Sequence, residues 1–303
     1  MGKILVCDSI AEEAIEILRS SGHTVIYEPN ITQQELLRRV VDIDAIVVRS
    51  RTRVTAEVIN LATKLRVIAR AGVGLDNIDT NAANNRGVQV VNSPDSLTNA
   101  VAEHALALFL SVARQISYAH RMMMDGEWPK SSLMGVELSG KILGVIGFGR
   151  IGRRLAQLSR PFNMTVLAYD VISPPEDLLR STGARMVGLD ELLRNSDFIS
   201  IHLPATAETE KMIGERELSV MKPNAIIVNT SRGTVIDEPA LVKFLKNGRI
   251  KGAGLDVFSE EPPKGEILRL NNVVLTPHIA GQTIEAQVSA GTTVARKVLE
   301  LLS

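Results

Sequence analysis

The sequence has little of what would indicate a secreted, metal-binding or membrane-inserted protein. Its 303 residues include a single cysteine, Cys7, so the chain can form neither an internal disulfide nor a thiolate metal centre. No apolar run reaches the roughly 18 residues that a transmembrane helix needs. The N-terminus begins with a strand-like stretch, residues 3–6, rather than with a signal sequence. We therefore expect a soluble cytoplasmic protein that holds no metal.

An excess of charge of either sign is also missing. Lys plus Arg and Asp plus Glu both number 34. No long run of like charge and no basic–aromatic cluster is present, so neither nucleic acid nor a membrane is an expected partner. The hydrophobic content is 45%, and the length is about twice that of a typical domain. Two globular domains with sizeable cores are therefore expected.

A glycine turn in the middle of the chain carries the most informative pattern. An apolar run over 142–146 predicts a buried strand, and Gly147, Gly149 and Gly152 then form a G-x-G-x-x-G turn before a helix. In a Rossmann fold these glycines allow a tight turn, the approach of a pyrophosphate and close packing of helix on strand. Amide groups at the helix start bind the phosphates. The next strand ends in Asp170, about 20 residues further on, where a carboxylate meets the adenosine ribose and disfavours NADP. We predict an NAD site.

The rest of the chain alternates between strand and helix patterns. Strands are expected at 3–6, 24–27, 45–48, 67–70, 89–91, 198–201, 225–229, 252–256 and 273–275. A long apolar helix over 98–124 connects the two series, and a final helix over 283–302 has no strand after it, so it can cross back onto the first domain. We expect two Rossmann-like α/β domains with parallel sheets. The substrate-binding domain is discontinuous, residues 1–97 and 283–303, and the NAD-binding domain, 98–282, is inserted in it.

Three chemically conspicuous loops follow strands of the second series. They contain Arg232, the carboxylate pair Glu260 and Glu261, and His278. Taken singly, the arginine could be a surface ion pair, the carboxylates a solvated pair and the histidine an ordinary hydrogen-bonding residue. In open α/β sheets, however, ligands bind at the carboxyl ends of the strands. The convergence of these side chains at one sheet edge, beside a dinucleotide, favours a catalytic site.

The order and spacing of six motifs show a resemblance to a known family. The motifs are 48–50, 70–77, 147–152, 229–233, 255–262 and 277–281. Over nearly its whole length the sequence resembles the NAD-dependent D-isomer-specific 2-hydroxyacid dehydrogenases, and within that family the enzymes that act on D-3-phosphoglycerate. The resemblance implies a catalytic trio of Arg232, Glu261 and His278. It also implies that backbone N–H groups around Gly72 to Gly74 hold the substrate carboxylate.

The chemistry of hydride transfer explains why such a trio is needed. When a 2-hydroxy acid loses hydride to a nicotinamide, its hydroxyl proton must leave as well, so a base must lie within hydrogen-bonding reach. Histidine suits this task because its pKa is close to the working pH. Glu261, on the other ring nitrogen of His278, would fix the tautomer and stabilise the imidazolium. Arg232 would bind the carboxylate and polarise the C2 oxygen, as a planar guanidinium does better than lysine.

The remaining predicted site residues fall into two groups. Further cofactor contacts are expected at Arg150, Ile151, His202, Pro204, Thr230, Ser231, Asp256, His278 and Gly281. Substrate contacts are expected at Arg49, Ser50, Arg70, Gly72, Val73, Gly74, Asn99, Lys130 and Arg232. For His202, structural packing is an alternative with nearly equal weight. For His104, next to Glu103 on the long helix, a hydrogen-bonded core or interdomain position is the preferred interpretation.

Three functions are compatible with these patterns. The leading expectation is the oxidation of D-3-phosphoglycerate to 3-phosphohydroxypyruvate in serine biosynthesis, with Arg49, Arg70 and Lys130 near the phosphate. Glyoxylate or hydroxypyruvate reduction, or the oxidation of another D-2-hydroxy acid, uses the same trio. An NAD-sensing corepressor is the remote alternative. The apolar surface of the long helix and of loop 125–134 predicts a homodimer, or a dimer of dimers, with Trp128 and Lys130 directed toward the partner's substrate cleft.

Overall fold

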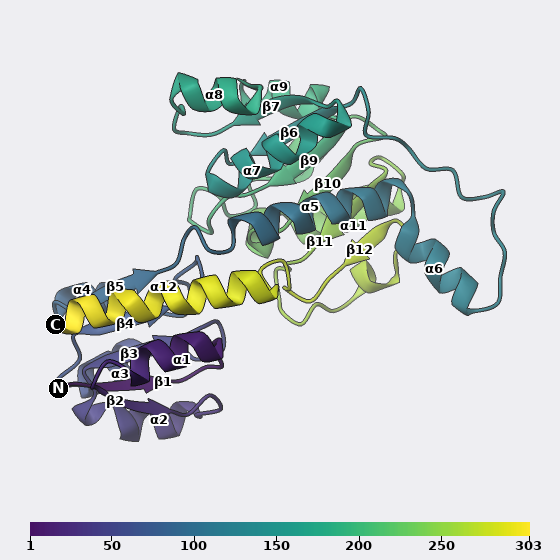
Figure 1. The fold of residues 1–303 in the computed structure, drawn as a ribbon. Helices are drawn as coiled ribbons and strands as arrows, with labels where there is room; N and C mark the ends of the chain where they lie inside the picture. The colour runs from purple at the N-terminus through teal and green to yellow at the C-terminus, as the bar shows by residue number, and fades with distance from the viewer. The chain divides into compact units, whose positions relative to one another are not determined.

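The structure is a computed structural model that describes residues 1–303. The chain divides into two compact units (Figure 1). The first, here called the terminal unit, consists of Met1–Thr98 and Gly281–Ser303, and the second, the central unit, consists of Asn99–Ala280. Both units are α/β structures built on parallel sheets, so the predicted fold class is confirmed. The predicted boundaries lie beside the observed ones, and the assignment of one unit to substrate and the other to NAD stays a prediction.

Five parallel strands form the sheet of the terminal unit, in the order β2-β1-β3-β4-β5. The strands are β1 (Lys3–Val6), β2 (Thr24–Tyr27), β3 (Ala45–Val48), β4 (Val67–Arg70) and β5 (Gln89–Asn92). The helices are α1 (Glu12–Arg19), α2 (Gln33–Arg39), α3 (Ala56–Leu61), α4 (Thr80–Asn85) and α12 (Ile284–Leu302). The strand order changes direction between β1 and β3, which is the position at which open α/β sheets bind ligands.

Helix α12 completes the terminal unit from the far end of the chain. Its buried residues Ala290, Val294 and Val298 share one hydrophobic cluster with Ile15 and Leu18 of α1. In Figure 1 the yellow α12 accordingly belongs to the same layered unit as the purple α1. Burial of these apolar side chains is what brings the C-terminal segment back to the first sheet.

Seven parallel strands form the sheet of the central unit, in the order β12-β11-β10-β9-β6-β7-β8. The strands are β6 (Ile142–Ile146), β7 (Thr165–Tyr169), β8 (Ala184–Met186), β9 (Phe198–Ile201), β10 (Ile226–Asn229), β11 (Gly252–Leu255) and β12 (Val273–Leu275). The helices are α5 (Thr98–Ala113), α6 (Ile116–Met124), α7 (Arg150–Ser159), α8 (Glu176–Thr182), α9 (Leu189–Asn195), α10 (Glu215–Val220) and α11 (Glu238–Lys246). The strand β8 was missing from the sequence-based expectation because its three residues include the exposed Arg185 and form no apolar run, unlike the three of β12.

The prediction of a single long helix over 98–124 is wrong, because this stretch forms two helices, α5 and α6. Gln115 between them has a left-handed backbone with φ of 55°. The cause is a tertiary contact: Val136 N–H donates to Ala113 O over 2.9 Å, and Gln115 Nε2 donates to Met134 O over 3.1 Å. A returning segment therefore binds the end of α5, in a stretch without glycine or proline to announce the break.

The helices of both units are too short or too polar to cross a lipid bilayer. The longest of them, α12, carries charged residues within its span and packs on the first sheet.

Candidate active site

The glycine turn joins β6 to α7, and β6 lies between β9 and β7 in the seven-stranded sheet. Gly147 has φ of 90°, and a Cβ on it would lie 2.6 Å from the carbonyl oxygen of His202. A Cβ on Gly152 would lie 2.3 Å from Gly147 O, whereas the corresponding position at Gly149 is open space. Glycine is thus required for the turn and for helix packing, and the open face at Gly149, at the N-terminus of α7, fits the approach of a pyrophosphate.

Asp170, at the end of β7, is tied to this turn. Its Oδ2 accepts a hydrogen bond of 2.7 Å from Phe148 N, and its Oδ1 accepts one of 3.0 Å from Ile172 N. The two bonds fix the carboxylate beside the turn that β6 and α7 form. A fixed negative charge there suits ribose hydroxyls and repels an additional phosphate.

Arg232, Glu261 and His278 follow three adjacent strands. Arg232 comes after β10, Glu261 after β11 and His278 after β12, and the three strands pair in parallel. Because parallel strands end at the same sheet edge, the three loops share that edge. All three belong to the central unit.

Glu261 and His278 are in direct contact. Nδ1 of His278 lies 2.9 Å from Oε2 and 3.2 Å from Oε1 of Glu261. Since a carboxylate only accepts, Nδ1 carries the proton in the neutral imidazole, and Nε2 is left with its lone pair. The side chain of His278 is 51% exposed, so Nε2 can be reached by a small molecule. This is the arrangement of a general base oriented by a carboxylate.

The Arg232 loop is held by an asparagine at the end of β10. Asn229 Oδ1 accepts from the N–H and hydroxyl of Ser231, and its Nδ2 donates to Arg232 O over 2.9 Å. Gly233 brings this loop against the Glu261 loop, because a Cβ there would lie 1.9 Å from the carbonyl of Phe258. The half-buried Arg232 is therefore presented next to the Glu261 segment by close backbone packing.

Asp256 lies under the His278 loop with no exposed surface. Its Oδ1 accepts from Thr276 Oγ1 over 2.6 Å and from Ile279 N over 2.8 Å, and its Oδ2 accepts from Ala280 N over 2.8 Å. Burial raises the pKa of this carboxyl, but these bonds and one from His104 outweigh it and lower the pKa. The sequence predicts that Asp256 contacts the cofactor. In the structure, both of its carboxylate oxygens accept hydrogen bonds from the His278 loop.

His202, directly after β9, is a half-buried histidine that stays neutral. Burial lowers its pKa to about 3. Nε2 lies 2.9 Å from Ser200 Oγ, whereas the buried Nδ1 has no partner in the chain. Thr230, after β10, likewise has a buried hydroxyl without a partner. Unsatisfied polar atoms of this kind at the edge that carries the glycine turn fit a bound polar ligand.

In the terminal unit the predicted substrate residues follow β3 and β4. Arg49 and Ser50 come after β3, at the β1–β3 switch point. Arg49 N–H donates to the buried carboxylate of Asp8 over 2.6 Å, and its guanidinium donates to Ser9 O and Gln282 Oε1. Burial lowers the pKa of Arg49, with the charge of Asp8 acting in the opposite direction. A partly desolvated guanidinium of this kind is stabilised by an anion.

Arg70 and Gly72 already have hydrogen-bond partners within the terminal unit. Arg70 donates to the carbonyl oxygens of Arg49 and Gly74, so it links the two loops. Gly72 N–H donates to Ser93 Oγ over 2.9 Å. Of the predicted carboxylate-binding amides, those of Val73 and Gly74 therefore remain as the donors on which the prediction depends.

Other predicted residues occupy varied positions. Asn99, at the start of α5, donates to Glu103 and accepts from Arg154 Nε over 2.6 Å. Lys130 is exposed in loop 125–134. Pro204 O accepts from Thr209 Oγ1, and Gly281 O accepts from Gln287 Nε2. Arg150 and Ile151 open α7, directly after the glycine turn.

Comparison with known proteins identifies the family. Residues 106–280 match the NAD-binding domain of the D-isomer-specific 2-hydroxyacid dehydrogenases. The chain belongs to this family. Its predicted relationship is confirmed, and the glycine turn and Asp170 are the parts of the structure that fit the NAD of the family.

Relatives within this dehydrogenase family carry more than one name. D-3-phosphoglycerate dehydrogenase of Methanocaldococcus jannaschii is 46% identical over 100% of this chain and 58% of its own length. Hydroxypyruvate reductase of Thermotoga maritima is 41% identical over 99% of this chain and 98% of its own length. The crystal structure of Aquifex aeolicus D-lactate dehydrogenase with NAD and lactic acid has a TM-score of 0.84 at 30% identity, covering 98% of this chain and 94% of that one. The chain thus spans little more than half the length of the curated D-3-phosphoglycerate dehydrogenases it matches.

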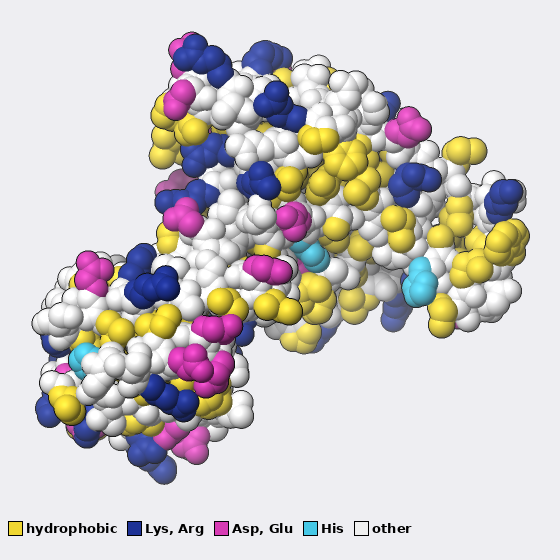
Figure 2. Space-filling view, in the orientation of Figure 1, with side chains coloured by type: hydrophobic (Ala, Val, Ile, Leu, Met, Phe, Trp, Pro, Cys, Tyr) yellow, Lys and Arg dark blue, Asp and Glu magenta, His cyan; other side chains and the backbone are white.

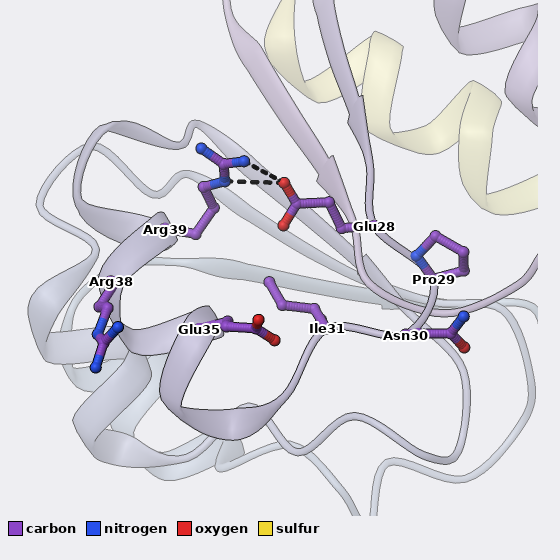
Figure 3. A pocket seen from close by; sticks show the side chains of 7 residues that line it. All are labelled: Glu28, Pro29, Asn30, Ile31, Glu35, Arg38 and Arg39. Carbon is purple, nitrogen blue, oxygen red and sulfur yellow. Dashed lines mark hydrogen bonds and ion pairs between the residues drawn. The ribbon is translucent and has the colours of Figure 1, made fainter.

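A hollow of about 510 Å³ lies beside α2 in the terminal unit (Figure 3). Its charged side chains are largely matched to one another. Arg39 Nε donates to Glu28 Oε1 over 3.0 Å, and Glu35 caps its own helix through Thr32. We assign no ligand to it, because Arg39 and Glu28 pair with each other and Glu35 is held by Thr32.

Some residues that organise the site escaped sequence reasoning. Asn229 shapes the Arg232 loop, Thr276 binds Asp256, and Asp8 holds Arg49. Asn229 had a local signal, since an asparagine that ends a strand before Thr-Ser is typical of an Asx turn. Thr276 and Asp8 had none, because their partners are distant in sequence.

Proposed function

We propose that the chain oxidises D-3-phosphoglycerate to 3-phosphohydroxypyruvate with NAD, a step of serine biosynthesis. The observation that carries the proposal is the Glu261–His278 pair, which stands at the same edge of the sheet as the glycine turn. The identity of 46% to a D-3-phosphoglycerate dehydrogenase over the whole chain supports the choice of substrate.

The residues of the chain account for the proton and for substrate orientation. Nε2 of His278 takes the proton of the C2 hydroxyl, since Nδ1–H is held by Glu261. Glu261 then stabilises the imidazolium that forms. Arg232 binds the carboxylate and polarises the C2 oxygen. The bound nicotinamide supplies the acceptor for the hydride that leaves C2.

The proposed NAD site extends from the glycine turn along the sheet edge. The amides at the start of α7 bind the pyrophosphate, and Asp170 binds the adenosine ribose. The unpartnered buried atoms of His202 and Thr230 would be satisfied by the cofactor, which explains why they are tolerated. Ser231, Pro204 and the remaining predicted contacts flank these positions.

The proposed substrate contacts in the terminal unit are Arg49, Ser50, Val73 and Gly74. Arg49 carries the phosphate assignment, because its guanidinium is half-buried and is held beside Ser9 and Gln282. Lys130 would add positive charge from loop 125–134.

We also propose that the protein forms a homodimer through α6 and this loop. Figure 2 shows hydrophobic side chains gathered over the protruding α6 region. The large exposed apolar side chains there are Ile116, Met123, Met124, Trp128 and Met134. A contiguous apolar surface of this kind favours association of two copies.

A reductase acting on hydroxypyruvate or glyoxylate is the second candidate. The hydroxypyruvate reductase relative is 41% identical and of matching length, 98% of it being covered. Its reaction needs the same trio and no phosphate-binding group.

A substrate panel distinguishes these candidates. Steady-state kcat/KM is measured for 3-phosphoglycerate, D-glycerate and D-lactate with NAD, and for hydroxypyruvate and glyoxylate with NADH. The proposal expects 3-phosphoglycerate to exceed D-glycerate, and Arg49→Gln to abolish that difference while leaving D-glycerate turnover nearly unchanged. Equal kcat/KM for the two acids would favour the reductase.

A further inference from the structure

His104 lies in the central unit on α5 and is not part of the trio. Its side chain is 20% exposed, and Nε2 lies 3.0 Å from Thr276 Oγ1 and 3.5 Å from Asp256 Oδ1. A histidine with this exposure and two polar neighbours could simply be a satisfied residue under the surface. The contacts that Thr276 and Asp256 make with the His278 loop indicate a further role.

The packing of α5 on β11 places His104 at the end of the strand. Cβ positions on Gly252 and Gly254 would lie 2.7 Å from Val112 Cγ1 and 2.9 Å from Leu108 Cβ. Four residues of helix advance about 6 Å, and two residues of strand advance about 6.6 Å. Each step of four residues along α5 therefore matches a step of two residues along β11. Val112 faces Gly252, Leu108 faces Gly254, and His104 faces Asp256, just beyond the end of the strand. The two glycines permit the close approach.

The hydrogen bonds form a chain with a defined direction. Asp256 is an acceptor at all of its contacts, so Thr276 Oγ1 must donate its single proton to Oδ1 over 2.6 Å. The oxygen of Thr276 is then an acceptor toward His104, and Nε2 of His104 carries the proton. His104 Nε2 is thus the donor to Thr276 Oγ1, and Thr276 Oγ1 is the donor to Asp256 Oδ1.

Asp256 and Thr276, at the end of this series of hydrogen bonds, hold the backbone around His278. Asp256 accepts from Ile279 N and Ala280 N, and His278 N donates to Thr276 O over 3.0 Å. His278 itself has φ of 55°, a left-handed conformation that is rare and costly for a residue with a side chain. Such a conformation persists only where surrounding bonds hold it, and Thr276 and Asp256 supply those bonds on both sides.

We propose that His104 is a positioning residue that orients the His278 loop through Thr276 and Asp256 without touching substrate. The proposal rests on the proposed role of His278 as the base. His104 Nε2–H binds Thr276, Thr276 and Asp256 hold residues 276–280, and the imidazole of His278 stays aligned with Glu261.

Kinetics of four variants test the chain of contacts. His104→Leu removes the donor, and we expect kcat to fall roughly tenfold, because small misplacement of a catalytic group costs one to two orders of magnitude. NADH affinity, measured by titration, should stay within about twofold. His104→Gln offers an amide donor near Nε2 and should recover most of kcat. Thr276→Val should resemble His104→Leu, and the double variant should be no worse than Thr276→Val, since both changes break one chain.

The matched control is Leu110→Ala, on the same helix and packed against the same core. It destabilises α5 without reaching Thr276, so kcat measured well below the unfolding temperature should stay near that of the unmodified protein. A fall in kcat for Leu110→Ala equal to that of His104→Leu would overturn the proposal in favour of a purely structural role. Additive losses in the double variant would do the same.

Hydrogen exchange gives a readout that is independent of turnover. The amides of Ile279 and Ala280 are held by Asp256, so a peptide covering 277–281 should exchange roughly tenfold faster in His104→Leu than in the unmodified protein or in Leu110→Ala. Unchanged exchange would overturn the proposal. If no 2-hydroxy acid is turned over by the unmodified protein but the exchange rate rises, then the proposed function fails and the positioning role of His104 stands.

Discussion

His278 Nδ1 lies 2.9 Å from Glu261 Oε2, although 17 positions separate the two residues in the chain. The contact exists because β11 and β12 are parallel neighbours whose following loops meet at one edge. It leaves Nε2 of His278 as the only unprotonated ring nitrogen. The pair therefore has a defined direction, with the carboxylate at Nδ1 and the proposed substrate position at Nε2.

The first prediction concerns this pair. His278→Ala should lower kcat by roughly 100- to 10,000-fold, the usual contribution of a positioned general base. NAD affinity, measured by titration, should change little, because the glycine turn and Asp170 are unaffected. Glu261→Gln keeps an acceptor oxygen and loses the charge, so its kcat should fall less. Near-normal turnover of His278→Ala would place the base elsewhere.

The second prediction concerns cofactor choice. The Asp170 carboxylate is fixed by Phe148 N and Ile172 N, so kcat/KM should be higher with NAD than with NADP. Asp170→Asn removes the charge that repels the additional phosphate, and the preference should fall at least about tenfold, or ~1.4 kcal/mol. Asp177→Asn, an exposed acid on α8, is the control and should leave the preference intact. A higher kcat/KM with NADP in the unmodified protein would contradict the assignment.

The third prediction concerns stability against pH. Burial lowers the pKa of His202 to about 3 in the folded protein, whereas the pKa in the unfolded state is about 6.5. As the pH falls below 6.5, the histidine is therefore protonated in the unfolded state but stays neutral in the folded state. The folded protein should therefore lose about 2 kcal/mol from this group between pH 7 and pH 5. His202→Asn removes that loss, so its free energy of unfolding should depend less on pH. Urea denaturation of both proteins at pH 5 and pH 7 measures the difference, and equal pH dependence would argue against a neutral His202 in the folded protein.

The fourth prediction concerns the exposed loop 125–134. If this loop reaches the partner's substrate site, mixing His278→Ala subunits with Lys130→Glu subunits should restore some activity toward 3-phosphoglycerate. In such a heterodimer one site carries both defects and the other carries neither. If the loop serves its own subunit, each site keeps one defect and the mixture stays inactive. Sedimentation analysis of the same samples shows whether dimers form.

Much of the fold was determined by local sequence patterns. The apolar run before Gly147 and the spacing of the three glycines identified β6, its turn and α7, because strand and helix periodicities are properties of a few consecutive residues. The strand-terminal positions of Arg232 and His278 followed in the same way. The family motifs then indicated which side chains to combine into a site.

The tertiary structure alone decided how those residues are held. The break at Gln115 depends on Met134 and Val136, and the link from His104 to Asp256 depends on α5 packing against β11. Each of these contacts joins segments far apart in the chain. Their geometry comes from the packing of helices on a sheet, which no local pattern encodes, so the sequence could propose His278 as the base but only the packed fold shows the contacts around its loop.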